Sequence, residues 1–190
     1  TLHHKLRAPG LPMARFNFIP GMESRRWAWD GKAENQPPEF KPNTIYPEDQ
    51  IRYRGRYPFG DEITISYAVQ GRGVLESPFV ETVQETPIIH RRFTIESGGN
   101  SLELVALSID GASPKIEGAR VSIEADGFTH LGWLQGDTKG MRWRTSKKGE
   151  LVLRIPASDA PLELDVALAV GKAGSAIDFV PSNLTIDLAD

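Results

Sequence analysis

The 190-residue chain contains no cysteine. This absence excludes disulfide bonds, thiolate nucleophiles, cysteine-ligated zinc and covalent c-type haem attachment within the chain. The chain also has no apolar run near the roughly 18 residues that cross a bilayer, and its first residues have no apolar core of a secretory signal. Because the sequence starts at Thr1 without methionine, we expect a mature or trimmed product, which leaves export open.

A large excess of charge of either sign is also missing. The formal net charge is −3 at pH 7, which disfavours binding to a nucleic-acid backbone because such binding needs a basic surface. Hydrophobic residues make up 39% of the chain and charged residues 25%, values that are ordinary for a globular protein. We expect one domain over residues 51–190, because halves of this length would each have little core.

Helical periodicity is absent, and a two-residue alternation takes its place. The clearest example is residues 63–69 (ITISYAV), where every second side chain is large and apolar, as in a half-buried strand. Residues 101–109 are apolar on both faces, which predicts a central strand covered on both sides. With glycine- and proline-containing turns between such segments, the pattern predicts an all-β fold, an antiparallel β-sandwich of jelly-roll or immunoglobulin-like type. The predicted strands cover residues 54–57, 62–70, 73–80, 88–96, 101–109, 115–125, 131–134, 141–145, 150–155, 162–170 and 184–188.

Residues 1–50 differ from the rest because they contain seven of the fourteen prolines. Proline interrupts helices and central strands, so we predict an extended, irregular N-terminal segment with one short strand at residues 14–19. Trp27 and Trp29 could anchor this segment by packing on the domain or on a partner.

No catalytic or metal-binding motif is present. The chain lacks a Gly-x-Ser-x-Gly elbow, and its glycine pairs lie between strands, where they form turns and not phosphate-binding loops. His3 and His4 are adjacent near the terminus, where their rings point in opposite directions on an extended chain. His90 and His130 could meet in space, but two histidines without a placed carboxylate are a weak metal signal. We therefore nominate no catalytic residue, cofactor-binding residue or metal ligand.

Arginine and aromatic residues are mixed in two places, and this mixture is the main functional signal. Arg52, Arg54 and Arg56 would share one face of a regular strand. Aromatic rings with polar neighbours bind sugars, and arginine with tyrosine or tryptophan is typical of protein-interface hot spots. A solvated face whose arginine stems cover the sheet is the structural alternative. The candidate surface for a partner or glycan comprises Trp27, Trp29, Arg52, Tyr53, Arg54, Arg56, Tyr57, Trp133, Arg142, Trp143 and Arg144.

A family resemblance covers about residues 53–107. Residues 53–61 (YRGRYPFGD), 65–69 (ISYAV), 73–76 (GVLE) and 93–95 (FTI) resemble an uncharacterised N-terminal domain of large planctomycete-type haem-binding proteins, which combine a β-propeller with a c-type cytochrome module. Residues 184–188 (LTIDL) are similar to the stretch that leads into that propeller. The resemblance implies a periplasmic or extracellular location and a redox-linked complex. It carries over no catalytic residue, and the haem-binding Cys-x-x-Cys-His module is not in this chain.

Three hypotheses for the function follow. The first is a non-catalytic accessory module that binds a protein partner or further domains of the same polypeptide. The second is a carbohydrate-binding module in which Trp133, Trp143, Tyr53 or Tyr57 stacks on a polysaccharide. The third is a metal-dependent enzyme that uses His90 and His130, and it is the least favoured. No cofactor is expected in this chain.

Overall fold

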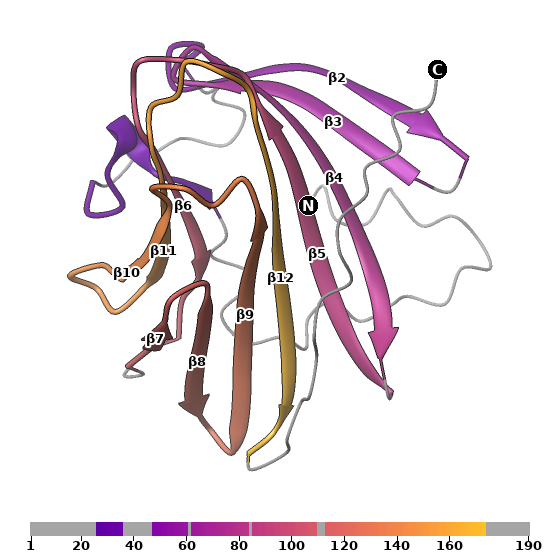
Figure 1. Cartoon of the computed structure of the whole chain (residues 1–190), viewed down its shortest axis with the longest axis vertical. Coiled ribbons are helices and arrows are strands. Elements are labelled where there is room, and N and C mark those ends of the chain that lie inside the picture. The colour runs from indigo at the N-terminus through magenta and orange to yellow at the C-terminus, as the bar shows by residue number, and fades with distance from the viewer. Residues whose placement is uncertain (1–25, 36–46, 61, 84, 110–112, 174–190) are drawn as a thin grey trace, which may run out of the picture.

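The structure is a computed structural model that describes residues 26–35, 47–60, 62–83, 85–109 and 113–173. Two antiparallel sheets pack face to face around a common core (Figure 1). The prediction of an all-β, antiparallel sandwich is confirmed. The strands predicted at residues 14–19 and 184–188 lie outside the described residues. The described part of the chain holds no helix with the length and hydropathy needed to cross a membrane.

The large sheet has eight strands, and each described neighbour pair is antiparallel. In spatial order they are β2 (Ile51–Phe59), β3 (Glu62–Val69), β4 (Arg72–Val83), β5 (Thr86–Ile95), β12 (Leu162–Lys172), β9 (Phe128–Gly136), β8 (Arg120–Ala125) and β7 (Lys115–Glu117). The strands β2 to β5 form one meander and β7 to β9 form another. The late strand β12 lies between them and joins the two meanders into one sheet.

The small sheet has the order β1 (Arg26–Trp27), β6 (Leu102–Leu107), β11 (Leu151–Ile155) and β10 (Arg142–Thr145). All six residues of β6 are buried, which confirms that this strand is covered on both sides. Its outer face is covered by residues after β1, since Ala28 and Ala33 form a buried cluster with Val105 and Val152. In residues 26–35, β1 is therefore a strand of the small sheet, and the residues after it pack on the outer face of that sheet.

The main core lies between the two sheets and follows the alternation of the strands. On β12, Leu164, Val166 and Leu168 point into it, while Ala167 and Ala169 belong to a second cluster on the opposite face of the large sheet. We call these two faces of the large sheet the core face and the outer face. Because strand partners share a face, the register assigns each residue of the large sheet to one of them.

The hairpin of β2 and β3 extends away from the region that the small sheet covers (Figure 1). Burial increases along β3 toward its end: Glu62 and Ile63 are exposed, whereas residues 67–69 are buried. Gln70 and Gly71 connect β3 to β4, and both have positive φ, as the two-residue turn of a tight hairpin requires. The base of the β2–β3 hairpin is thus fixed in the core, while its far end is exposed.

Candidate functional site

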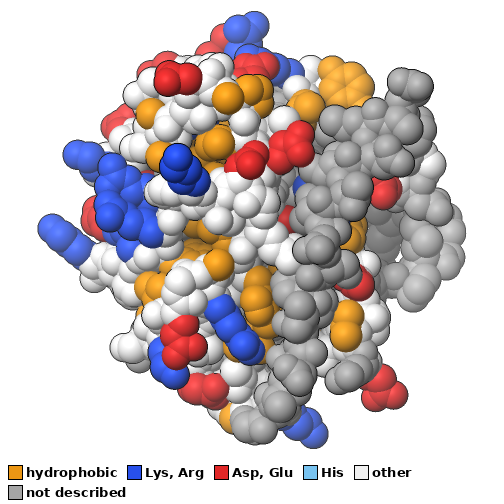
Figure 2. All heavy atoms as spheres, in the orientation of Figure 1, with side chains coloured by type: hydrophobic (Ala, Val, Ile, Leu, Met, Phe, Trp, Pro, Cys, Tyr) orange, Lys and Arg blue, Asp and Glu red, His pale blue; other side chains and the backbone are white. Residues whose placement is uncertain are grey.

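The exposed arginine and tyrosine side chains lie on β2, which is the outermost strand of the large sheet as far as the chain is described. Tyr53 is 67% exposed and Tyr57 is 58% exposed. Every residue of β2 whose burial is described is exposed or half-exposed. Figure 2 shows apolar side chains at the surface near β2 and β3, beside both acidic and basic ones.

A β-bulge at Arg54 divides these side chains between two faces. The register pairs Tyr53 with Tyr67 and then Gly55 with Ser66, so that Arg54 is the extra residue. Such a bulge reverses the alternation of faces along a strand. The expectation that the three arginines share one face is therefore wrong, because it assumed a regular strand.

The register gives each side chain of β2 its face. Arg52 is opposite Ala68 and lies on the outer face, whereas Arg56 is opposite Ile65 and lies on the core face, where it is exposed. By the same argument Tyr53 is on the core face and Tyr57, opposite Thr64, is on the outer face. The phenol of Tyr57 folds back over Gly55, where an added Cβ would meet its hydroxyl oxygen at 3.2 Å.

The ion pairs of the β2 arginines are long and exposed. Arg52 lies 3.7 Å from Glu48, and Arg54 lies 3.7 Å from Glu96. Arg56 forms no hydrogen bond or ion pair with any other described residue. Exposed pairs of this kind contribute little to stability, so these guanidinium groups can exchange their partners at small cost.

The second arginine–aromatic segment, around β10, is used by the fold itself. Trp143 is only 4% exposed, and its indole N–H donates to the carbonyl of Ala119 at 3.0 Å. Trp133 is 6% exposed. The interpretation of these two rings as exposed sugar platforms is therefore wrong, because Trp143 packs in the main core and Trp133 packs in the cluster on the outer face of the large sheet. Arg142 remains exposed on β10.

Arg144 ties the N-terminal segment to the small sheet. Its guanidinium makes two hydrogen bonds with Glu34, at 2.6 and 3.0 Å, and two with Glu103. The backbone N–H of Ala33 donates to Glu103 at 2.8 Å. The hydrogen bond from Arg144 lowers the pKa of Glu34 from its ordinary value of 4.5 to about 2, and both carboxylates raise the pKa of Arg144.

Trp27 is part of the core and not of a free surface. Its indole N–H donates to the hydroxyl of Tyr67 at 3.0 Å, and that hydroxyl donates to Glu76 at 2.6 Å. Arg91 donates to the other oxygen of Glu76 at 2.6 Å. Burial, reinforced by the charge of Glu76, raises the pKa of Tyr67. The next tryptophan, Trp29, is half-buried in the short 3-10 helix η4 (Trp29–Gly31).

His90 and His130 do not form a pair. His90 is opposite Ala167 on β12, and His130 is opposite Val170, so the two rings lie on opposite faces of the large sheet. Burial lowers the pKa of His130. Within the described ranges, no three His, Cys, Asp or Glu side chains are arranged to hold a metal ion.

His90 instead belongs to a buried polar group that the sequence did not reveal. Its Nδ1 is 2.7 Å from Asp165, its Nε2 is 3.4 Å from Glu81, and its ring stacks on Phe79 at 4.4 Å. Both His90 and Asp165 are less than 5% exposed. The signal that could have found this group is Asp165 itself, a lone aspartate within the apolar strand 162–170. These contacts join strands β4, β5 and β12 through buried, hydrogen-bonded polar side chains, as a structural link between strands requires.

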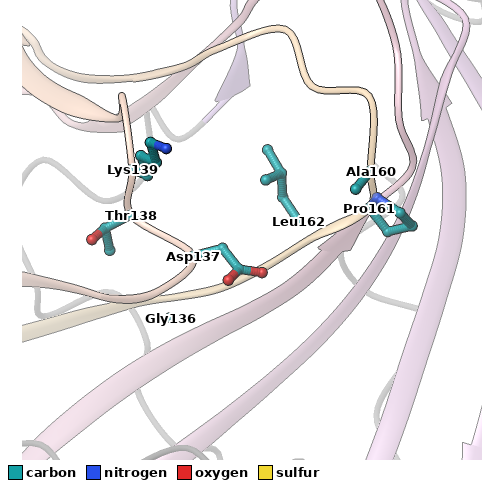
Figure 3. Close-up of a pocket in the computed structure, with 7 residues that line it drawn as sticks. All are labelled: Gly136, Asp137, Thr138, Lys139, Ala160, Pro161 and Leu162. Carbon is teal, nitrogen blue, oxygen red and sulfur yellow. The ribbon is translucent and has the colours of Figure 1, made fainter.

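A pocket of about 510 Å³ lies where the loop after β9 meets the start of β12 (Figure 3). Its lining combines the apolar Pro161 and Leu162 with the polar Asp137 and Lys139. Asp137 is already engaged, since its carboxylate accepts a hydrogen bond from the N–H of Glu163 at 2.9 Å. The pocket has no aromatic wall and no buried charged group, so it gives no specific indication of a ligand.

One domain family matches part of the chain. Residues 14–76 match a domain of unknown function, DUF6797. No curated protein sequence matches the chain. The matched segment includes all of β2 and β3 and ends before Glu81, His90 and Asp165.

Proposed function

We propose that the protein is a non-catalytic interaction module that binds a protein partner through β2, as part of an extracytoplasmic complex. The observation that carries the proposal is the exposure of Tyr53 and Tyr57, at 67% and 58%, among three arginines on an outermost strand. Tyrosine and arginine are the residue types that dominate binding energy at protein interfaces. The partner is a separate subunit or a further domain of the same polypeptide.

Two further observations support this choice. The family match includes β2 and does not extend to His90 or Asp165, so it supports the exposed strand and gives no support to the buried polar group. The resemblance of residues 53–107 to a domain of haem-binding proteins supports an extracytoplasmic, redox-linked setting.

Binding to a polysaccharide is less well supported. With Trp133 and Trp143 buried, it would depend on Tyr53 and Tyr57, which lie on opposite faces of the sheet. A flat platform for sugar rings needs aromatic faces on one side. No single observation now favours this function over protein binding.

A position-specific photo-crosslink tests the proposal. A benzophenone amino acid replaces Tyr57 in one variant and Phe128 in a control variant, since Phe128 is also an exposed aromatic residue, at 41%, but lies in the β8–β9 hairpin. After irradiation of cells that make the protein, we expect one defined crosslinked product from position 57 and none from position 128. Equal products from both positions, or none from position 57, would contradict the proposal.

A further inference from the structure

We propose that the element bound by β2 is an extended acidic segment of the partner, which adds as a strand beside β2, at the edge that the large sheet has among the described residues. This inference rests on the proposed function of β2 and adds the chemistry and conformation of the bound segment. An edge strand offers backbone N–H and C=O groups to a further strand, and alternate side chains give the specificity.

The distribution of positive charge over two faces favours an added strand. Arg52 is on the outer face and Arg56 is on the core face. The side chains of an added strand also alternate between the two faces, so one acidic strand can place carboxylates against both arginines. The exposed face of a partner helix or a sugar chain would reach only one side of the sheet.

The arginines are available to such a strand. The pairs with Glu48 and Glu96 are 3.7 Å long and exposed, and Arg56 has no charged partner among the described residues. Guanidinium groups bind carboxylates through two parallel hydrogen bonds. A carboxylate from the partner can therefore give a better contact than those that Arg52 and Arg54 have within the chain.

The same charges argue against a second copy of this chain as the occupant. Two β2 strands that pair antiparallel about Gly55 would place Arg54 of one copy opposite Arg56 of the other. Like charges directly opposite each other destabilise a strand pair. An acidic segment would instead place carboxylates opposite these arginines. The arginines therefore disfavour pairing with a second copy and favour an acidic partner.

Pro58 limits where the strand can add. Proline has no N–H to donate, and the bulge at Arg54 interrupts the regular ladder. The contact is therefore short, and charge pairing has to supply a large share of its affinity. Binding should weaken steeply with ionic strength, because exposed charge pairs are screened by salt.

The test uses the whole protein and labelled synthetic peptides with the repeat Glu-Glu-Thr-Thr, Gln-Gln-Thr-Thr or Lys-Lys-Thr-Thr, which place the variable side chain on both faces of a strand, with binding followed by fluorescence anisotropy. We expect the Glu peptide to bind, and Arg56→Glu to weaken it about tenfold, equivalent to about 1.4 kcal/mol. Arg56→Lys should retain most of the binding. The control is Lys172→Glu, a reversal of charge at an exposed position at the end of β12, which should alter the affinity less than about twofold. N-methylation of alternate residues of the Glu peptide removes their backbone N–H groups, and it can be applied to either of the two alternating sets of residues. If the peptide adds as a strand, methylation of the set whose N–H groups face β2 should abolish binding.

The possible failures can be told apart. Equal binding of the Glu and Gln peptides, or an equal loss with Lys172→Glu, overturns the acidic partner. Unchanged binding of both N-methylated peptides overturns strand addition. If either failure occurs while the crosslink from position 57 persists, the proposed function stands and only this inference falls. Loss of the crosslink overturns the proposed function.

Discussion

The two arginine–aromatic segments, residues 52–57 on β2 and 142–144 on β10, have similar compositions but different environments. Trp143 is 4% exposed in the main core, whereas Tyr53 is 67% exposed. Arg144 is held by Glu34 and Glu103, while Arg56 has no such partner within the described ranges. The difference arises because β10 faces the large sheet, whereas the hairpin that carries β2 extends beyond the small sheet. Residue types alone do not define an interface, and the position of a strand relative to the opposite sheet decides which aromatic rings remain free.

The sharpest test of this contrast is Trp143→Ala. Removing a buried indole leaves a cavity and removes one of the two hydrogen bonds that the carbonyl of Ala119 accepts, so we expect the free energy of unfolding to fall by about 3–5 kcal/mol. Urea unfolding followed by circular dichroism measures this loss. A loss below about 1 kcal/mol would show that Trp143 is not part of the core.

The next largest effect is expected for Arg144→Ala. Glu103 is 8% exposed and would keep only the N–H of Ala33 among the partners described above. Leaving a buried carboxylate without its cation is unfavourable. Because Arg144 is itself partly exposed, at 26%, we expect only a moderate loss in the free energy of unfolding, about 2–3 kcal/mol. Arg142→Ala, two residues away and exposed, is the control and should change stability by less than about 0.5 kcal/mol.

The contribution of Arg144 should depend on pH. The folded-state pKa of Glu34 is about 2, below its ordinary value of 4.5. A depressed carboxyl pKa stabilises the fold above the ordinary value, and this stabilisation is lost as the pH falls through the folded-state value. The stability difference between wild type and Arg144→Ala should therefore shrink from about pH 5 toward about pH 2. A constant difference in unfolding free energy over this range would contradict the ion pair.

A smaller effect is expected for Asp165→Asn. The change keeps the shape of the side chain but replaces the carboxylate that lies 2.7 Å from His90. We expect the free energy of unfolding to fall by about 1–2 kcal/mol. If the buried group is purely structural, the crosslink from position 57 should be unaffected. A lost crosslink in a variant that still folds would connect this group to binding.

The smallest effect on stability is expected on β2. Tyr53→Ala and Tyr57→Ala remove exposed rings and should each alter the unfolding free energy by less than about 0.5 kcal/mol. Their effect should appear in binding, as weaker anisotropy changes with the Glu peptide. Large destabilisation by either variant would mean that the ring supports the fold and is not a free contact.

Local patterns predicted much of the sandwich. The alternation in residues 63–69 and the two apolar faces of residues 101–109 are properties of single strands, and both are present as β3 and β6. The sheet order was beyond prediction, because the pairing of β12 with β5 and β9 joins residues far apart in sequence.

The candidate site was predicted only in part. Tyr53, Tyr57 and the three neighbouring arginines are exposed as expected, but the bulge at Arg54 could not be read from the sequence because it depends on the register with β3. The burial of Trp143 depends on the opposite sheet, and the contact of His90 with Asp165 depends on β12. These features come from long-range packing, which a single-strand pattern does not contain.

The central place of β12 has a consequence for biosynthesis. In order of synthesis the two meanders precede residues 162–172, and until that strand is present the adjoining edges of β5 and β9 have no strand between them. Unpaired edges of this kind invite pairing with other chains. The joining of the two meanders into one sheet therefore waits for a single late strand, which covers both inner edges at once.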